Sequence, residues 1–538
     1  MVAPEPSLLH HSPQPRIDRL LAKQTLTFAF ATGSGSDPFE RLFSRLRRPA
    51  TTFAVDCFAT DLFLDAFVER CLPHRIPGTD RSFHGSAIRK VLAAPPTSSK
   101  DIVLRQGIFA ELAKRADLHE ASQTAWKQID QLRISLESSE IGKRFSPIQR
   151  RIGILRQFDQ LLKHLAESFE NCESALRRVA VFARSVLEDA DYAPVAQLLD
   201  YEEHLATLQL SVRIDRDGQL RHLEIVNQRE NTENTLHHGP LTRLWQRLLS
   251  ALRGYPVRER EIVGSLVEAL FDRIGSALVS VFELALDFEF YLALDGYRRL
   301  CEDRKLELCL PTLTTVSDGI PLRLTQLFNP FLVLEERRPV PCDLTLEQSG
   351  LVLLTGPNSG GKTRLLQSIG FVQLLAQSGT WVTARAATVP LRTGLFVSLV
   401  HEASADQKEG RLGTELLRIR RLFERLEYDQ LVLLDELCSG TNPSEGEEIV
   451  ELVISLLTRL RPQALITTHF LQFAERLSKQ PPIDDLRFLQ VSLDPHLHPL
   501  YQFVPGVAST SLASQTAERL GVTREALETL IESKRDTQ

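Results

Sequence analysis

The sequence has few of the features that mark membrane, secreted or metal-stapled proteins. Its 538 residues include one methionine, Met1, and seven cysteines that are scattered and form no Cys-x-x-Cys pair. A single methionine excludes an adaptable methionine-rich binding face. The odd number of dispersed cysteines indicates reduced thiols in a cytoplasmic protein, so neither a disulfide framework nor a structural metal site is expected.

Long apolar runs and a leader sequence are also missing. No apolar stretch approaches the roughly 18 to 20 residues that cross a bilayer, so no membrane attachment is expected. Residues 1–20 lack a basic start followed by an apolar core, which argues against a secretory signal. Their prolines and polar residues instead predict a disordered lead of about fifteen residues.

A positive charge excess is absent too. The chain has 63 Lys and Arg against 69 Asp and Glu, and residues 321–538 hold 22 basic and 26 acidic side chains, so neither half is basic. A broad DNA-binding surface normally has such an excess, because neutralising backbone phosphates supplies much of the affinity. Two local basic clusters either contact nucleic acid or form an ordinary solvated helix face. They are Arg45, Arg47 and Arg48, and Lys143, Arg144, Arg150, Arg151 and Arg156.

The most informative segment is LVLLTGPNSGGKT at 351–363, an apolar run that breaks into a glycine-rich loop. Its glycines allow consecutive N–H groups to point at phosphate oxygens. Lys362 supplies a positive charge for the outer phosphates and Thr363 a hydroxyl for Mg²⁺, and a helix is expected over 363–376. The predicted nucleotide-binding residues are Gly356, Pro357, Asn358, Ser359, Gly360, Gly361, Lys362 and Thr363.

Two further apolar runs end in chemically active side chains. Residues 431–436, LVLLDE, end in Asp435 and Glu436, and residues 464–468 lead into His469. If both runs are buried parallel strands, these side chains lie at the same sheet edge as the glycine loop. Asp435 is then placed to hold the Mg²⁺ shell, and Glu436 to polarise a water against the γ-phosphate.

Together, the segments TGPNSGGKT, LLDELCSGTNPSEG and ITTHF resemble the ATPase domain of the MutS family of mismatch-repair proteins, which is related to the ABC ATPases. LLAQSG at 374–379 and NPSEG at 442–446 are most similar to the second bacterial branch of the family, whose members lack a mismatch-recognition domain. The resemblance is strong over residues 320–538, weaker over 85–320 and faint before residue 85.

This resemblance implies a P-loop ATPase that uses ATP and Mg²⁺, releases ADP and phosphate, and works as a homodimer around two composite sites. It assigns Asn358 to sensing the γ-phosphate, Glu436 to the catalytic base and His469 to orienting the attacking water. Thr363 and Asp435 are assigned to the metal.

The chain departs from the family pattern in the loop that reaches the partner's γ-phosphate. Family members follow Gly-Arg with small hydroxyl residues there, whereas GRLGTELL at 410–417 has Leu412 and Gly413 in their place. Either Thr414 substitutes from a shifted loop, or the composite site closes less well and hydrolysis is slow. A third interpretation is that 410–417 only starts the helix that follows.

The chain is too long for a single core, so several domains are expected. We interpret residues 1–84 as the disordered lead and a helical or mixed segment, 85–320 as a mainly helical core with a lever and clamp, and 321–538 as an α/β P-loop ATPase and dimerisation domain. Alternation around Asp-Gly in 208–227 predicts a small β-hairpin. Helical periodicity over 241–300 predicts a long helix, either a lever or a plain bundle helix.

The predicted function is an ATP-dependent DNA-binding protein in which hydrolysis drives dimer closure on mismatched, branched or distorted DNA, as in the repair of DNA damage. The alternative is a nucleotide switch that acts on protein or ribosomal partners. An ABC transporter ATPase is disfavoured because no LSGGQ-like stretch precedes Asp435. A mismatch-sensing role is implied only by the resemblance and not by a reader motif, because the Phe-x-Glu motifs at Phe67, Phe109 and Phe473 fall in helical patterns where Phe indicates core.

Overall fold

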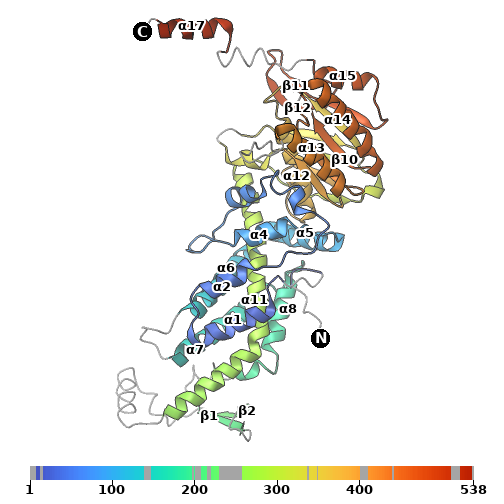
Figure 1. Cartoon of the computed structure of the whole chain (residues 1–538). Coiled ribbons are helices and arrows are strands. Elements are labelled where there is room, and N and C mark those ends of the chain that lie inside the picture. Colours follow the sequence, from blue (N-terminus) through green and yellow to red (C-terminus); the bar gives the residue numbers. More distant parts are fainter. Residues whose placement is uncertain are drawn as a thin grey trace. The chain divides into compact units, whose positions relative to one another are not determined.

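The chain forms two compact units in a computed structural model (Figure 1). The described residues are 8–11, 16–138, 147–196, 199, 207–214, 220–229, 257–335, 338–347, 349–399, 410–438, 442–509 and 522–535. Unit 1 comprises residues 1–48, 74–88 and 103–292, and unit 2 comprises residues 49–73, 89–102 and 293–538. Each unit is therefore assembled from separate stretches of the chain, and the domain boundaries expected at residues 84 and 320 remain predictions.

Unit 1 is mainly helical. Its helices are α1 Arg19–Thr32, α2 Asp37–Ser44, α6 Ala116–Glu137, α7 Pro147–Ser168, α8 Arg177–Leu187, and parts of α4 Gly85–Leu92, α5 Ser99–Lys114 and α11 Val257–Asp303. On α7 the predicted apolar positions Ile152, Leu155 and Phe158 are buried, because a spacing of three or four residues puts them on one face. Pro147 begins this helix, where its missing N–H costs no hydrogen bond.

The long helix predicted within residues 241–300 is confirmed as α11, which has 47 residues. Its residues up to 292 belong to unit 1 and the remainder to unit 2, while 241–256 lie outside the described residues. Among the helices that the structure describes, α11 included, none has both the length and the hydropathy of a membrane span.

The predicted hairpin is confirmed as two antiparallel strands, β1 Thr207–Ile214 and β2 Leu220–Arg229. The residues that connect them, 215–219, are not among those described.

Unit 2 contains two mixed sheets. The six-stranded sheet has the order β12-β11-β6-β10-β9-β8, and all neighbours are parallel except β11 and β12. The four-stranded sheet has the order β3-β7-β4-β5, in which only β3 and β7 are parallel. The strands are β3 Thr312–Thr314, β4 Leu322–Leu327, β5 Cys342–Leu346, β6 Gly350–Thr355, β7 Ala386–Pro390, β8 Leu395–Ser398, β9 Leu431–Leu434, β10 Gln463–Thr467, β11 Leu486–Leu493 and β12 Pro499–Pro505. The mixed α/β class expected for this region is confirmed.

Helices cover the six-stranded sheet on both faces (Figure 1). They and the short turns of unit 2 are η1 Val55–Cys57, α3 Leu64–Ala66, η2 Phe67–Cys71, η4 Val316–Asp318, η5 Pro330–Leu334, α12 Lys362–Gln377, α13 Gly410–Arg425, α14 Pro443–Leu457, η6 Thr458–Leu460, α15 Leu471–Lys479 and α17 Arg524–Arg535. Alternate strand residues point to opposite faces. Val432 and Leu434 pack with α13, α14 and α15, whereas Leu433 faces Gly370 of α12.

Residues 49–73, which we term the N-terminal strap, pack on the sheet of unit 2 although they are far from it in sequence. The carboxylate of Asp61 accepts the N–H of Leu399, directly after the edge strand β8, at 2.8 Å. Leu62 lies so close to α12 that a β-carbon at Gly370 would come within 2.7 Å of it. The strap therefore covers the β8 edge, which would otherwise be open to pairing with another strand.

Candidate functional site

The glycine-rich loop joins β6 to α12, at the carboxyl edge of the six-stranded sheet. Gly356 and Gly361 have φ of 147° and 89°, which residues with a β-carbon rarely adopt. A β-carbon at Gly356 would lie 2.6 Å from Val491, so close packing requires glycine as well. Pro357 is buried, whereas Asn358 and Ser359 are exposed at the tip of the loop. The loop is thus a tight backbone cradle whose open side carries Asn358 and Ser359.

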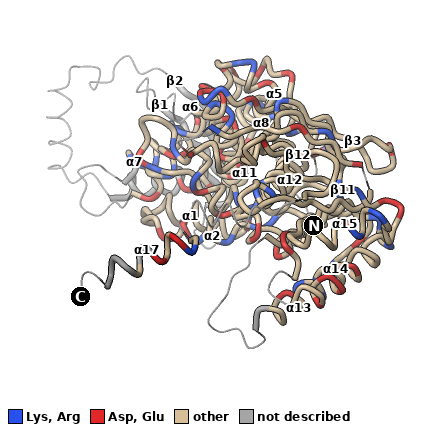
Figure 2. Tube along the Cα trace, turned by 90° about the horizontal axis from the view of Figure 1, so that it is seen from above, with Lys and Arg blue, Asp and Glu red and all other residues tan. Residues whose placement is uncertain are grey.

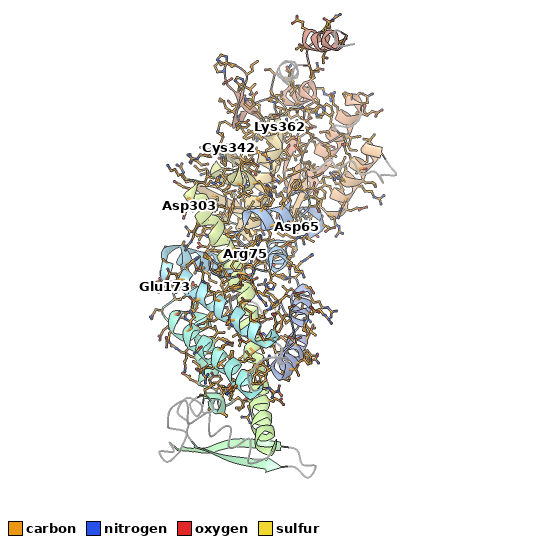
Figure 3. The ribbon with its side chains drawn as sticks, turned by 90° about the vertical axis from the view of Figure 1, so that its left-hand side faces the viewer. Asp65, Arg75, Glu173, Asp303, Cys342 and Lys362 are labelled. Atoms are coloured by element: carbon orange, nitrogen blue, oxygen red, sulfur yellow. The ribbon has the colours of Figure 1, made fainter. Side chains whose placement is uncertain are left out.

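Lys362 is the first residue of α12 and is labelled in Figure 3. Its ammonium donates to the carbonyl oxygens of Gly356 at 3.0 Å and Pro357 at 3.1 Å. Burial lowers the pKa of Lys362, and the nearby carboxylates of Glu436 and Asp435 oppose that shift. The result is a cation held between the loop and the acid pair, with Glu436 Oε1 at 3.9 Å.

Asp435 directly follows β9 and is 6% exposed. Its carboxylate accepts two hydroxyl hydrogen bonds, from Thr363 at 2.6 Å and from Thr467 at 2.5 Å. The structure therefore brings together Thr363 and Asp435, the two residues predicted for the metal. Hydroxyl and carboxylate oxygens are the ligand type that Mg²⁺ accepts, so the residues present fit that ion.

Glu436 has φ of 47°, a left-handed conformation that is uncommon for a residue with a β-carbon. Its N–H donates to the hydroxyl of Thr467 at 2.8 Å. Thr467 ends β10 and is fully buried. The sequence motif contains this threonine, but nothing in its pattern predicts that one hydroxyl bonds to both members of the acid pair.

His469 follows β10, two residues after Thr467, and is half-buried with its ring against that of Phe470. Because β9 and β10 are parallel and pair Leu434 with Ile466, both strands end at the same sheet edge. His469 thus lies at the edge that carries Asp435 and Glu436, as the sequence predicts.

A cavity of about 980 Å³ lies beside the glycine loop. Its lining includes Gly361 and Arg364 from the loop and α12, and Phe328, Tyr501 and Phe503 from neighbouring segments. The ring of Tyr501 would lie 3.2 Å from a β-carbon at Gly361, so it packs directly on the loop. No sequence motif points to this cavity, because its aromatic residues come from β12 and from the residue that follows β4.

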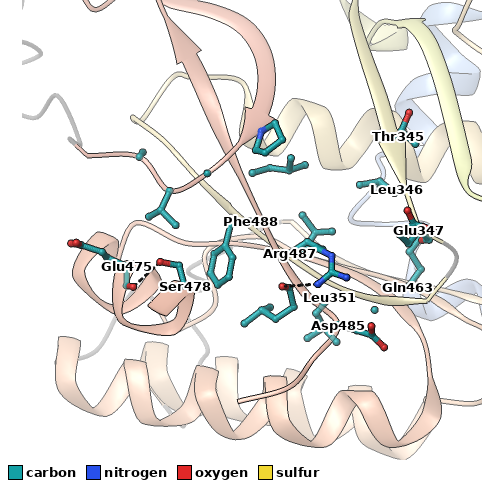
Figure 4. A pocket seen from close by; sticks show the side chains of 18 of the residues that line it. Thr345, Leu346, Glu347, Leu351, Gln463, Glu475, Ser478, Asp485, Arg487 and Phe488 are labelled. Carbon is teal, nitrogen blue, oxygen red and sulfur yellow. Dashed lines mark hydrogen bonds between the residues drawn. The ribbon is translucent and has the colours of Figure 1, made fainter. Parts of the chain in front are cut away.

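A second cavity, of about 850 Å³, lies at the opposite edge of the same sheet (Figure 4). Arg487 and Phe488 of β11 and Glu475 and Ser478 of α15 line it. None of the nucleotide-binding or catalytic residues predicted from the sequence lines this cavity.

The expected substitute for the missing hydroxyls, Thr414, lies inside α13, which begins at Gly410. Residues 410–417 are helical, as the third interpretation expects, and the role of Thr414 stays a prediction. Residues 400–409, which precede it, lie outside the described residues, as do Gly440 and Thr441 after the acid pair.

Two arginines of the predicted basic cluster donate hydrogen bonds to carbonyl groups at the ends of helices in unit 1. Arg150 donates to the carbonyl oxygens of Ala29, Phe30 and Leu136, and Arg151 donates to that of Ala31. These carbonyls belong to the last turns of α1 and α6, which cations stabilise. Lys143 and Arg144 lie outside the described residues. Both signs of charge occur on the described helices, but α1 and α8 carry only basic side chains and α14 only acidic ones (Figure 2).

Comparison with known proteins gives one family match and several relatives. Residues 352–536 match the family model described as MutS domain V. A protein named Endonuclease MutS2 from Thermomicrobium roseum is 27% identical over 296 residues, which are 53% of this chain and 36% of the relative. The protein of the same name from Carboxydothermus hydrogenoformans is 26% identical over 454 residues, 78% of this chain and 55% of the relative. That from Streptococcus mutans is 31% identical over 223 residues, 41% of this chain and 27% of the relative. The chain spans about half or less of the length of these relatives.

Proposed function

Because the chain belongs to the MutS family through its domain V, we propose that it is an ATPase that binds distorted DNA and couples ATP turnover to that binding. One observation carries the proposal: a glycine loop, a buried lysine and an acid pair converge at one sheet edge of unit 2. Thr363 lies 2.6 Å from Asp435, and Lys362 lies 3.9 Å from Glu436.

The triphosphate of ATP is bound by the N–H groups of the loop, from Gly356 to Gly361, and by the ammonium of Lys362. Asn358, exposed at the tip of the loop, senses the γ-phosphate. The cavity beside Gly361 receives the nucleoside, with Tyr501 and Phe503 offering aromatic rings to a base.

Thr363 and Asp435 would hold Mg²⁺, which when bound neutralises charge that develops on the phosphoryl oxygens. Because Asp435 is buried and accepts two hydroxyl bonds, its carboxylate keeps one orientation. Glu436 takes the proton of the attacking water, and His469 orients that water. The fold of a P-loop ATPase is the arrangement that best accounts for this strand, loop and helix sequence.

Dimer closure around two such sites would then transmit turnover to the helices of unit 1 through α11, whose residues belong to both units. The relatives carry the word endonuclease in their names, but this chain spans only 36% and 55% of the length of the two cited relatives. Our proposal is therefore confined to ATP turnover and DNA binding.

The direct test is Lys362→Ala, measured as phosphate release from Mg-ATP. We expect turnover to be abolished, because the outer phosphates lose their buried cation. A suitable control is Lys479→Ala, which removes an exposed lysine of the same unit that pairs with Glu475, and it should keep normal turnover. Hydrolysis at the wild-type rate in Lys362→Ala would show that the glycine loop is not the site that binds the triphosphate.

A further inference from the structure

We propose that Thr467 is a positioning residue for the acid pair: one hydroxyl fixes the carboxylate of Asp435 and the backbone turn that directs Glu436. This inference rests on the proposed ATPase function and adds a residue to it. Thr467 would touch neither nucleotide nor metal, and would act only through its two neighbours.

The chemistry of a hydroxyl suits this double role. A threonine hydroxyl has one hydrogen to donate and lone pairs with which to accept. Here it donates to Asp435 Oδ1 at 2.5 Å and accepts the N–H of Glu436 at 2.8 Å. Thr467 is fully buried, so water does not compete for either bond. Adjacent residues of one strand end are thereby tied to the end of the neighbouring strand.

The bond to Glu436 matters because the turn there is disfavoured. With φ of 47°, Glu436 holds a conformation that non-glycine residues adopt only when their surroundings enforce it. The hydrogen bond from the N–H of Glu436 to the hydroxyl of Thr467 helps to hold this conformation. This turn also decides where the carboxylate points, and in the structure it points toward Lys362, at 3.9 Å.

The bond to Asp435 matters because the two carboxylate oxygens have separate partners. Oδ2 accepts the hydroxyl of Thr363, the other residue that would hold Mg²⁺, and Oδ1 accepts that of Thr467. Without Thr467, the carboxylate could rotate away from Thr363. Groups that orient a metal ligand in this manner typically contribute about 10- to 100-fold to metal affinity or activity.

The experiment compares Thr467→Val, Thr467→Ala and Thr467→Ser in the full chain. A fluorescent ATP analogue reports nucleotide binding, first in EDTA and then over a Mg²⁺ titration, and phosphate release gives kcat and KM. We expect the Thr467→Val and Thr467→Ala variants to have a higher Mg²⁺ concentration at half-saturation and a lower kcat, each changed by about 10-fold or more. Binding in EDTA should stay within about twofold of wild type, and Ser should restore both parameters.

Thr468→Val is the matched control, because Thr468 is also buried but its hydroxyl accepts the N–H of Phe470. It should leave the Mg²⁺ titration unchanged even if it lowers the thermal midpoint. Equal losses in Thr468→Val, or a wild-type Mg²⁺ titration and kcat in whichever of Thr467→Val and Thr467→Ala folds, would overturn the inference. If the wild-type chain itself failed to hydrolyse ATP, the proposed function would be wrong instead.

Discussion

The carboxylate of Glu436 should be needed for turnover but not for ATP binding, because the loop and Lys362 make their contacts without it. In Glu436→Gln the amide cannot take a proton from water, so ATP is bound and retained. We expect phosphate release to fall by at least about 100-fold, and ATP to shift the variant toward a dimer on size exclusion.

The matching control is Glu475→Gln, since Glu475 is an exposed acid of the same unit that pairs with Lys479. A Glu436→Gln variant that turns over ATP normally would mean that another residue is the base.

Single residues also mark how far sequence reasoning reaches. Lys362, Thr363 and Asp435 could be predicted because they sit at fixed spacings after strand-like runs, and the structure brings them together at one edge. The role of Thr467 could not be predicted, because it depends on the left-handed turn at Glu436. A sequence motif does not specify a positive φ angle at a non-glycine residue. The roles of these residues in catalysis stay predictions.

Arg150 shows the limit of reading charge from sequence. A run of basic residues suggests either a nucleic-acid contact or a solvated face, yet Arg150 donates to carbonyls at the ends of two helices. The pairing of a side chain with backbone that is 120 residues away depends on tertiary packing. Charge patterns alone do not contain that information.

At the scale of elements, the N-terminal strap contacts both the end of β8 and helix α13, the elements that precede and follow residues 400–409. Asp61 accepts the N–H of Leu399 on one side, and Asp56 forms an ion pair with Arg421 of α13 on the other, at 2.5 Å. The hydrogen bond from Arg421 lowers the pKa of Asp56. This ion pair is therefore present at neutral pH, and its contribution is lost only as the pH falls below the ordinary carboxyl range.

Asp61→Ala should weaken the end of β8, because the N–H of Leu399 loses its acceptor in a partly buried position. We expect a loss of about 1–3 kcal/mol in the free energy of unfolding of unit 2, measured by urea denaturation, and ATP turnover lower by several-fold. Asp65→Ala is the control within the strap, since Asp65 pairs only with Arg89 among the contacts described for it. If Asp61→Ala were as stable and active as that control, the strap would be a passive cover.

Element boundaries inside the strong motif were predictable, while the strap was not. The helix expected over 363–376 is observed as Lys362–Gln377, because a glycine loop and an uninterrupted apolar face define both ends. The strap has no periodic pattern and contains only short turns. Its packing on unit 2 depends on tertiary contacts such as that of Leu62 with Gly370. That contact joins segments that no local signal connects.

At the scale of the whole molecule, DNA binding should separate the proposed function from its alternative. Filter binding to duplex, mismatched and four-way DNA over a salt series should give affinities that fall with salt, with a log–log slope of about −0.9 for each phosphate contacted. ATP should change the affinity of the wild-type chain. In Lys362→Ala the DNA affinity should remain while the ATP effect disappears.

Absent or salt-insensitive binding would instead favour a protein or ribosomal partner. The slope is informative because the chain has 63 basic against 69 acidic side chains, so specific contacts rather than a general positive field would have to produce it.

The strap also imposes an order of events on biosynthesis. Asp61 and its partner Leu399 are 338 residues apart, and the strap residues Phe58, Leu62 and Phe67 are fully buried in the finished protein. Synthesis proceeds at about 5–20 residues per second. The apolar strap therefore leaves the ribosome roughly 15–70 s before the surface that it covers is complete. During that interval the nascent chain must be shielded by a chaperone or by transient self-contacts, and slow translation would lengthen its exposure to aggregation.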